Sequence, residues 1–403
     1  MILFRAKFDR SGAVTKLLLP SLALLLAGAS LLTLVRAPDW MWIWKLTILM
    51  GEFGHWIAWL ALGLALLAGY RADGTARVIT LALCAFALFG LLRPVWLARA
   101  MAEKLPANLG AAFGGGRAAG TAFDVGRLYR IGPGTPAIQV TTEIFARPDG
   151  QELKVDFYAP LPVATGRDTG SRRPAPCIVV IHGGGWDGGD RTQLAAWNYR
   201  WAARGYAVAA ISYRLAPRWI WPAQREDTLA AIAWLKAHAG QLGFDPTRLV
   251  LLGRSAGGQI ATAVSYGAGD PAIRGVIALY APQDMPFVWS VSREDDALNS
   301  AKLMRQYLGG PPTDERRERY ETSSGQWLAR KDSPPTLLLH GVLDTLSWDR
   351  HSDRLTARLA ELHVPHYYLR LPWATHGFDF NLDGPGGQLA DYAIGHFLTV
   401  VAP

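Results

Sequence analysis

A serine flanked by small residues follows an apolar run, in the sequence GRSAG at residues 253–257. The run at 249–253 predicts a buried strand, and a helix is expected from about residue 258. Small residues on both sides allow the sharp turn between a strand and a helix that exposes a serine hydroxyl. The pattern therefore predicts that Ser255 is a nucleophile.

A second motif, HGGGW at residues 182–186, follows the apolar, β-branched run at 177–181. Consecutive glycines let backbone amides converge on one point, as the oxyanion of an acyl-transfer reaction requires. A phosphate cradle is the alternative, but the lysine and the Gly-Lys-Ser/Thr ending of such loops do not follow here. We therefore predict an oxyanion loop, with His182 and Gly183 as supporting residues.

A serine hydroxyl needs a base to remove its proton and a carboxylate to orient that base. Of the nine histidines, His376 stands just past a predicted strand, in the sequence ATHGF. Asp344 follows another predicted strand, and the order serine, aspartate, histidine is that of triads built on such a turn. The soluble-domain histidines outside the glycine loop are otherwise expected to be structural. The competing acids are Asp284, Asp349 and Asp353, the last two being placed to cap a helix.

Strand-like and helix-like segments alternate through the second part of the chain. This alternation predicts an α/β fold, with a mostly parallel sheet covered on both faces and catalytic groups at the carboxyl ends of its strands. A hairpin is expected first, followed by an alternation that a polar, helical insertion at 286–325 interrupts. The predicted strands are 138–146, 152–159, 177–182, 206–213, 249–253, 275–280, 336–340 and 367–371, and the predicted helices are 227–239, 352–362 and 389–400.

Long uncharged runs fill the first hundred residues. We expect a membrane domain at 1–105, a glycine-rich flexible linker at 106–135 and a catalytic domain at 136–403. Two spans are the alternative to three, and a signal peptide is the alternative for the first. The predicted spans lie at about 17–35, 46–70 and 76–98, with an interfacial aromatic belt at Trp40, Trp42 and Trp44.

Charged residues near these spans suggest how the chain lies in the membrane. Six basic residues would be inside and four outside if the amino terminus is cytoplasmic, which weakly favours an integral protein of the cell (inner) membrane with an extracytoplasmic catalytic domain. Two spans would reverse this preference. Glu52 and His55 form a polar pair near the second span, expected to be interfacial rather than a metal site or a proton relay.

Composition excludes several classes of protein. The net charge of +8 comes from scattered basic residues, many of them next to apolar segments, so we expect membrane lipid rather than nucleic acid as a partner. The two cysteines lie in apolar runs and cannot form a disulfide framework. The predicted chemistry requires no metal and no organic cofactor.

Six ordered motifs together resemble the α/β-hydrolase superfamily, and within it the hormone-sensitive-lipase-like carboxylesterases and the related acetyl and feruloyl esterases. The motifs are HGGGW, YRLAP, WPAQREDTLAAIAWL, GRSAGG, SPPTLLLHGVLD and THGF, within residues 138–400. The resemblance implies an α/β-hydrolase fold, with Ser255 as nucleophile, His376 as base and Asp344 as its orienting acid. It also implies oxyanion donors from the amides of Gly184, Gly185 and Ala256.

Arg254 and Arg218 depart from the family pattern, because acidic residues are usual at both positions; the two could be a compensating change. The implied activity is hydrolysis of carboxylic esters through an acyl-enzyme, on a small or lipid-like ester. An amide or formamide hydrolase and a catalytically silent binding module are the alternatives. Four tryptophans near the predicted site, Trp186, Trp197, Trp219 and Trp221, are either pocket or core residues.

Overall fold

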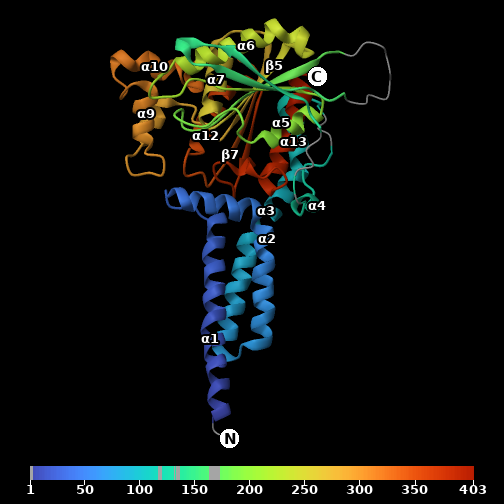
Figure 1. Cartoon of the computed structure of the whole chain (residues 1–403), viewed down its shortest axis with the longest axis vertical. Coiled ribbons are helices and arrows are strands. Elements are labelled where there is room, and N and C mark those ends of the chain that lie inside the picture. The colour runs from blue at the N-terminus through green and yellow to red at the C-terminus, as the bar shows by residue number, and fades with distance from the viewer. Residues whose placement is uncertain (1–2, 117–119, 131, 133–136, 163–172) are drawn as a thin grey trace.

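The computed structural model describes the chain apart from residues 1–2, 117–119, 131, 133–136 and 163–172, and it describes side chains from Leu17 onward. Figure 1 shows an α/β domain from which a bundle of helices extends, with the amino terminus at the far end of the bundle.

The α/β domain is built on one eight-stranded sheet, in the order β1-β2-β4-β3-β5-β6-β7-β8. β1 pairs antiparallel with β2, and β2 with β4, while all other neighbouring strands are parallel. The predicted hairpin is thus β1–β2, at one edge of the sheet. The strands are β1 Val140–Ala146, β2 Leu153–Tyr158, β3 Ala175–Ile181, β4 Ala207–Ile211, β5 Phe244–Arg254, β6 Ile273–Leu279, β7 Thr336–Gly341 and β8 His366–Leu371.

Helices cover both faces of this sheet, because the central strands carry apolar side chains on both faces and must be shielded on both sides. One face packs against α6 (Ala223–Leu242), α7 (Ala256–Gly267) and α12 (Arg350–Glu361). The other face packs against α5 (Ala195–Ala203), α13 (Pro385–Val401) and the last turns of α3 (Gly74–Phe113).

Between β6 and β7 the chain forms short helices, in the region where the polar insertion is predicted. These are α8 Met285–Val291, α9 Ser300–Leu308, the 3-10 helix η3 Asp314–Arg316, α10 Arg317–Thr322 and α11 Gly325–Leu328. The insertion leaves the sheet at the carboxyl end of β6. It therefore lies on the same edge as the predicted catalytic groups.

The bundle consists of α1 (Leu3–Ser30), the later part of α2 (Met41–Arg71) and the first part of α3, while the first part of α2 lies across the end of the bundle beneath the α/β domain (Figure 1). The helices approach closely at small residues, because a Cβ on Gly54 would lie 2.8 Å from the Leu91 carbonyl oxygen and one on Gly90 would lie 2.7 Å from Ser30 Cβ. By length and composition α2 and α3 are able to cross a membrane, and residues 17–33 form a shorter apolar helix.

Part of the predicted linker is helical. The prediction placed the linker at 106–135 and the end of the third apolar segment near 98, but α3 continues to Phe113. Leu105 and Leu109 are buried against the domain, and this contact keeps the chain helical despite Pro106. A further short helix, α4, spans Val125–Leu128. Residues 117–119, 131 and 133–136 of the predicted linker and boundary lie outside the described residues.

Replacing Leu109 with alanine is expected to destabilise the protein by about 2–5 kcal/mol, because it leaves a cavity between α3 and the sheet face. Lys104→Ala changes an exposed residue on the same helix and should cost less than about 0.5 kcal/mol. Thermal unfolding of the detergent-solubilised chain measures both. Equal stability of the two variants would show that the end of α3 is not part of the domain core.

Candidate active site

Ser255 lies at the turn between β5 and α7, as its sequence context predicts. Its backbone has φ +52° and ψ −121°, a strained conformation for a residue other than glycine. The turn is so tight that a Cβ on Gly253 would lie 2.1 Å from the Gly257 carbonyl oxygen, and one on Gly257 would lie 2.2 Å from the Ile181 carbonyl oxygen. The flanking glycines are therefore required by close backbone approach.

The glycine loop follows β3 and faces the same turn. The Gly183 amide donates to Gln193 Oε1 at 2.8 Å. In the part of the chain that the structure describes, the amides of Gly184, Gly185 and Ala256 donate to no protein acceptor. Gly185 and Ala256 line a cavity together with Ser255. Two residues with unpaired amides, Gly185 and Ala256, thus share the cavity with the serine, and Gly184 directly precedes Gly185 in the loop.

His182 contacts the glycine loop and a neighbouring tyrosine. Its Nδ1 donates to the Gly183 carbonyl at 2.8 Å, and its ring stacks on Tyr213 at 4.2 Å between centroids. Burial lowers the pKa of the imidazole, which favours the neutral ring. His182 is therefore a neutral ring that contacts the glycine loop through Nδ1.

Asp344 and His376 come together in the loops after β7 and β8. His376 Nδ1 donates to Asp344 Oδ2 at 2.8 Å, while Asp344 Oδ1 accepts from the amides of Leu346 and Ser347 at 2.8 and 2.9 Å. Burial by itself raises the pKa of Asp344, but the charge of His376 and hydrogen bonds from both His376 and His340 hold it well below its ordinary value. The carboxylate is thus kept ionised.

The competing acids are engaged elsewhere. Asp349 pairs with Arg370 at 2.8 Å and occupies the N-cap position of α12, as the sequence predicts, although its side chain makes no capping hydrogen bond. Asp353 lies in the first turn of α12. Asp284 caps α8 and pairs with Arg354 at 2.6 Å.

Ser255 and Asp344 line one cavity, and His376 bonds to Asp344. The Ser255 amide donates to the Leu279 carbonyl at 2.9 Å. Tyr280 follows Leu279, and its ring centroid lies 4.4 Å from that of His376. Among the described residues no hydrogen bond joins Ser255 Oγ to His376. Such bonds often tighten only when substrate binds.

His340 is a second imidazole on Asp344, and the sequence reasoning assigned it only a structural role. Its Nε2 lies 3.1 Å from Asp344 Oδ2 and 2.8 Å from the Ser347 carbonyl, while its Nδ1 lies 2.7 Å from Ser352 Oγ. The signal available in the sequence was its position four residues before Asp344, at the end of a buried strand.

A buried ion pair missed by the sequence reasoning lies under the site. Arg254 Nε donates to Asp379 Oδ2 at 2.6 Å, and the Tyr280 hydroxyl donates to Asp379 Oδ1 at 2.6 Å. Burial alone lowers the pKa of Arg254, but the Asp379 carboxylate more than offsets this and the pKa is raised. Arg254 thus pairs with Asp379. Arg218, proposed to compensate for Arg254, instead lies over the ring of Trp219.

Helix α2 contacts the segment that carries His376. Trp44 Nε1 donates to the His376 carbonyl at 2.8 Å, and Glu52 accepts from the Gly386 amide at 2.9 Å and from Trp373 Nε1 at 3.3 Å. His55 Nε2 donates to the Leu128 carbonyl at 2.8 Å. Glu52 and His55, predicted to be an interfacial pair, are thus buried where the bundle joins the domain.

The four tryptophans near the site differ in their surroundings. Trp186 lines the serine cavity, donates to Gln259 Oε1 at 2.7 Å and stacks on Tyr307. Trp197 and Trp221 are buried in the core, and Trp219 is partly exposed beside Arg218. Trp186 is thus a pocket residue and Trp197 and Trp221 are core residues, while Trp219 is neither.

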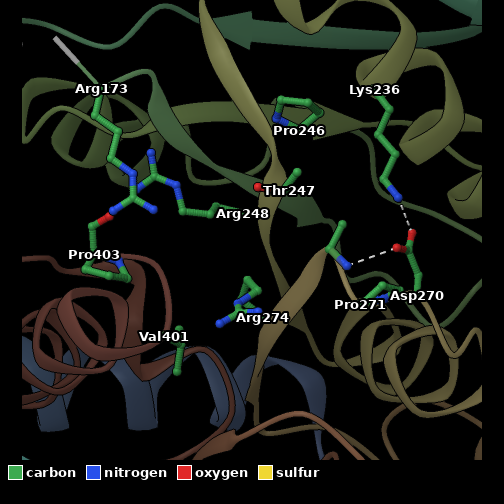
Figure 2. A pocket seen from close by; sticks show the side chains of 11 residues that line it. Arg173, Lys236, Pro246, Thr247, Arg248, Asp270, Pro271, Arg274, Val401 and Pro403 are labelled. Atoms are coloured by element: carbon green, nitrogen blue, oxygen red, sulfur yellow. Dashed lines mark hydrogen bonds and ion pairs between the residues drawn. The ribbon is translucent and has the colours of Figure 1, made fainter. Parts of the chain in front are cut away.

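Two cavities stand out. The one at the serine measures about 270 Å³. A larger cavity of about 770 Å³ lies beside the first residues of β5 and β6, away from the carboxyl ends of the strands. Arg248 and Arg274 line it, and Lys236 pairs with Asp270 there (Figure 2). It contains no predicted site residue. Within the described residues, no group of three or more histidine, cysteine or acidic side chains is arranged to hold a metal ion.

This chain is similar to known proteins in both sequence and fold. The family model BD-FAE matches residues 167–359. An esterase from Thermogutta terrifontis, solved with propionate, superposes with a TM-score of 0.53 at 22% identity, covering 67% of this chain and 98% of that protein. The chain therefore has the α/β-hydrolase fold. Among proteins of this fold, it resembles the hormone-sensitive-lipase-like esterases.

Curated relatives point to the same group. This chain is 28% identical to Esterase LipC of Mycobacterium tuberculosis. The match covers 57% of this chain and only 59% of LipC. It is 26% identical to the probable carboxylic ester hydrolase LipM of the same organism, covering 84% of this chain and 82% of LipM. The LipM match is longer than the α/β domain and therefore extends into the amino-terminal helices.

Removing the carboxylate of Asp379 as Asp379→Asn is expected to cost about 3–5 kcal/mol of stability, because it leaves the buried guanidinium of Arg254 without a countercharge. Asp314→Asn breaks an exposed pair with Arg317 and should cost less than about 1 kcal/mol. Urea unfolding compares the two. The double variant Arg254→Met/Asp379→Leu should recover much of the loss, and its failure to do so would contradict the charge argument.

Proposed function

We propose that this chain is a serine hydrolase that cleaves carboxylic esters through an acyl-enzyme. The observation that carries the proposal is the buried hydrogen bond between Asp344 and His376, on the same edge of the sheet as the strained Ser255 and three unpaired amides. The names of the similar proteins, esterases and carboxylic ester hydrolases, support the bond type.

In this mechanism His376 takes the proton of Ser255 as the hydroxyl oxygen attacks the ester carbonyl carbon. With Nδ1 bonded to Asp344, the neutral His376 ring keeps Nε2 unprotonated and able to accept the serine proton, and the carboxylate stabilises the imidazolium that forms. The amides of Gly184, Gly185 and Ala256 hold the negative oxygen. His376 then protonates the leaving alcohol. Water, deprotonated by His376, attacks the acyl-enzyme carbonyl, and the acid leaves as Ser255 regains its proton.

Ser255→Ala is expected to lower the hydrolysis of p-nitrophenyl acetate by about 10⁴-fold or more, because the nucleophile is removed while the fold remains. Ser290→Ala, at an exposed serine on α8, is the matched control and should keep full activity. Initial rates and unfolding temperatures of the three proteins make the comparison. Undiminished turnover in Ser255→Ala would overturn the assignment.

The same variant separates the remaining alternatives. A silent binding module would not be labelled at Ser255 by a fluorophosphonate, whereas the proposed enzyme is labelled in the wild type and not in Ser255→Ala. Amide hydrolysis uses the same groups, so matched ester and anilide substrates decide between the two bond types. We expect the ester to be the faster substrate.

We further propose that α1, α2 and the first part of α3 anchor the enzyme in a membrane as three spans. Large apolar side chains on these helices are exposed in the chain by itself, among them Leu17, Leu60, Leu66, Val78 and Phe89. Such a continuous apolar surface is costly in water and favourable in lipid. The amino terminus lies at the end of the bundle far from the α/β domain (Figure 1), so three spans would put the two on opposite sides of the membrane.

We expect the protein to stay with membranes through an alkaline carbonate wash and to be released only by detergent. In intact cells, added protease should cleave the α/β domain if the amino terminus is cytoplasmic, as the distribution of basic residues predicts. A cytoplasmic protein of known location serves as the control for cell lysis. Release by carbonate alone would contradict the membrane anchor. Protection of the α/β domain, under conditions in which the protease cleaves a known extracytoplasmic protein, would contradict the orientation.

A further inference from the structure

The cavity at Ser255 is not closed by the α/β domain alone. Its wall includes Arg36 and Asp39, which belong to the connection between the 3-10 helix η1 (Leu31–Thr33) and α2. This connection joins two of the proposed spans. The active site thus opens beside the end of the bundle nearest the domain.

The connection is fixed in place by polar contacts. Arg36 donates to the Val342 carbonyl at 3.2 Å and pairs with Asp349 at 3.3 Å, both in the loops after β7. Asp39 pairs with Arg293 of the insertion at 3.4 Å. These contacts make the connection a structured side of the cavity mouth.

Apolar side chains surround this mouth. From the insertion, Val288, Val291, Leu298, Leu303 and Met304 line the cavity. On the bundle side, Trp40 and Trp42 directly follow Asp39 and are 58% and 62% exposed. Exposed indoles at the end of apolar helices are typical of the interface between lipid and water.

The guanidinium groups of the lining already have carboxylate partners. Arg36 and Arg293, its two guanidinium groups, are paired with Asp349 and Asp39. Burial lowers the pKa of His351, the remaining basic group of the lining, to about 3. A substrate with an anionic head group would therefore find no unpaired cation among the residues that line the cavity.

We propose that the substrate is an uncharged amphiphilic ester dissolved in the membrane, which reaches Ser255 between the α1–α2 connection and the insertion. The cavity of about 270 Å³ is smaller than the usual range of about 300–1,000 Å³, so it holds the ester group and a short part of the chain. The rest of the molecule stays at the membrane surface beside Trp40 and Trp42. This inference rests on the proposed ester hydrolysis.

The test uses the full chain in phosphatidylcholine vesicles and two uncharged esters, p-nitrophenyl acetate in water and 1-monooleoylglycerol in the bilayer. The double variant Trp40→Ser/Trp42→Ser should keep the rate on the acetate. On monooleoylglycerol its KM should rise several-fold with kcat unchanged, because only access from the bilayer is impaired. Tyr70→Ser, an 81% exposed aromatic at the other end of α2, is the matched control and should behave as the wild type.

A charged lipid tests the head-group argument. Lysophosphatidylglycerol with the same acyl chain should be hydrolysed more slowly than monooleoylglycerol. The inference is overturned if the wild type cleaves the acetate but not monooleoylglycerol, if the double variant equals the wild type on both esters, or if the anionic lipid is the better substrate. Absence of both acetate turnover and Ser255 labelling would instead overturn the proposed function itself.

Discussion

The buried carboxylate of Asp344 is the group around which the candidate site is organised. One of its oxygens accepts hydrogen bonds from two backbone amides, and the other accepts hydrogen bonds from two imidazoles. The carboxylate therefore keeps its charge although it is fully buried. A buried charge is tolerated only when it is paired and hydrogen-bonded in this way. The loops after β7 and β8 are consequently held together, and His376 is presented at the sheet edge where β5 turns at Ser255.

A second set of contacts ties this edge to the helical bundle. Trp44 and Glu52 of α2 bind the segment that carries His376, and Arg36 and Asp39 form part of the cavity wall. In the other direction, the last turns of α3 cover one face of the sheet. The helices and the α/β domain therefore share a core and a site, and the proposed membrane surface lies where the substrate cavity opens.

Predictions from local sequence agreed best with the structure where conformation depends on near neighbours. The eight strands and the turn at Ser255 follow from apolar runs and from glycines at positions that admit no side chain, such as Gly253 and Gly257. The linker was misplaced because a glycine-containing stretch has low intrinsic helix stability, whereas burial of Leu109 against the domain overrides that preference. Local composition does not report such a contact.

The sequence by itself determined the alternation of strands and helices, the strained turn at Ser255 and the glycine loop, because each arises within a few residues of chain. Only the tertiary structure decided that Asp379 neutralises Arg254, that His340 shares Asp344 with His376, and that α2 holds the histidine segment. Some of these pairs are separated by more than a hundred residues. Their formation depends on which faces of distant elements are buried together, and a linear pattern of residue types does not specify that choice.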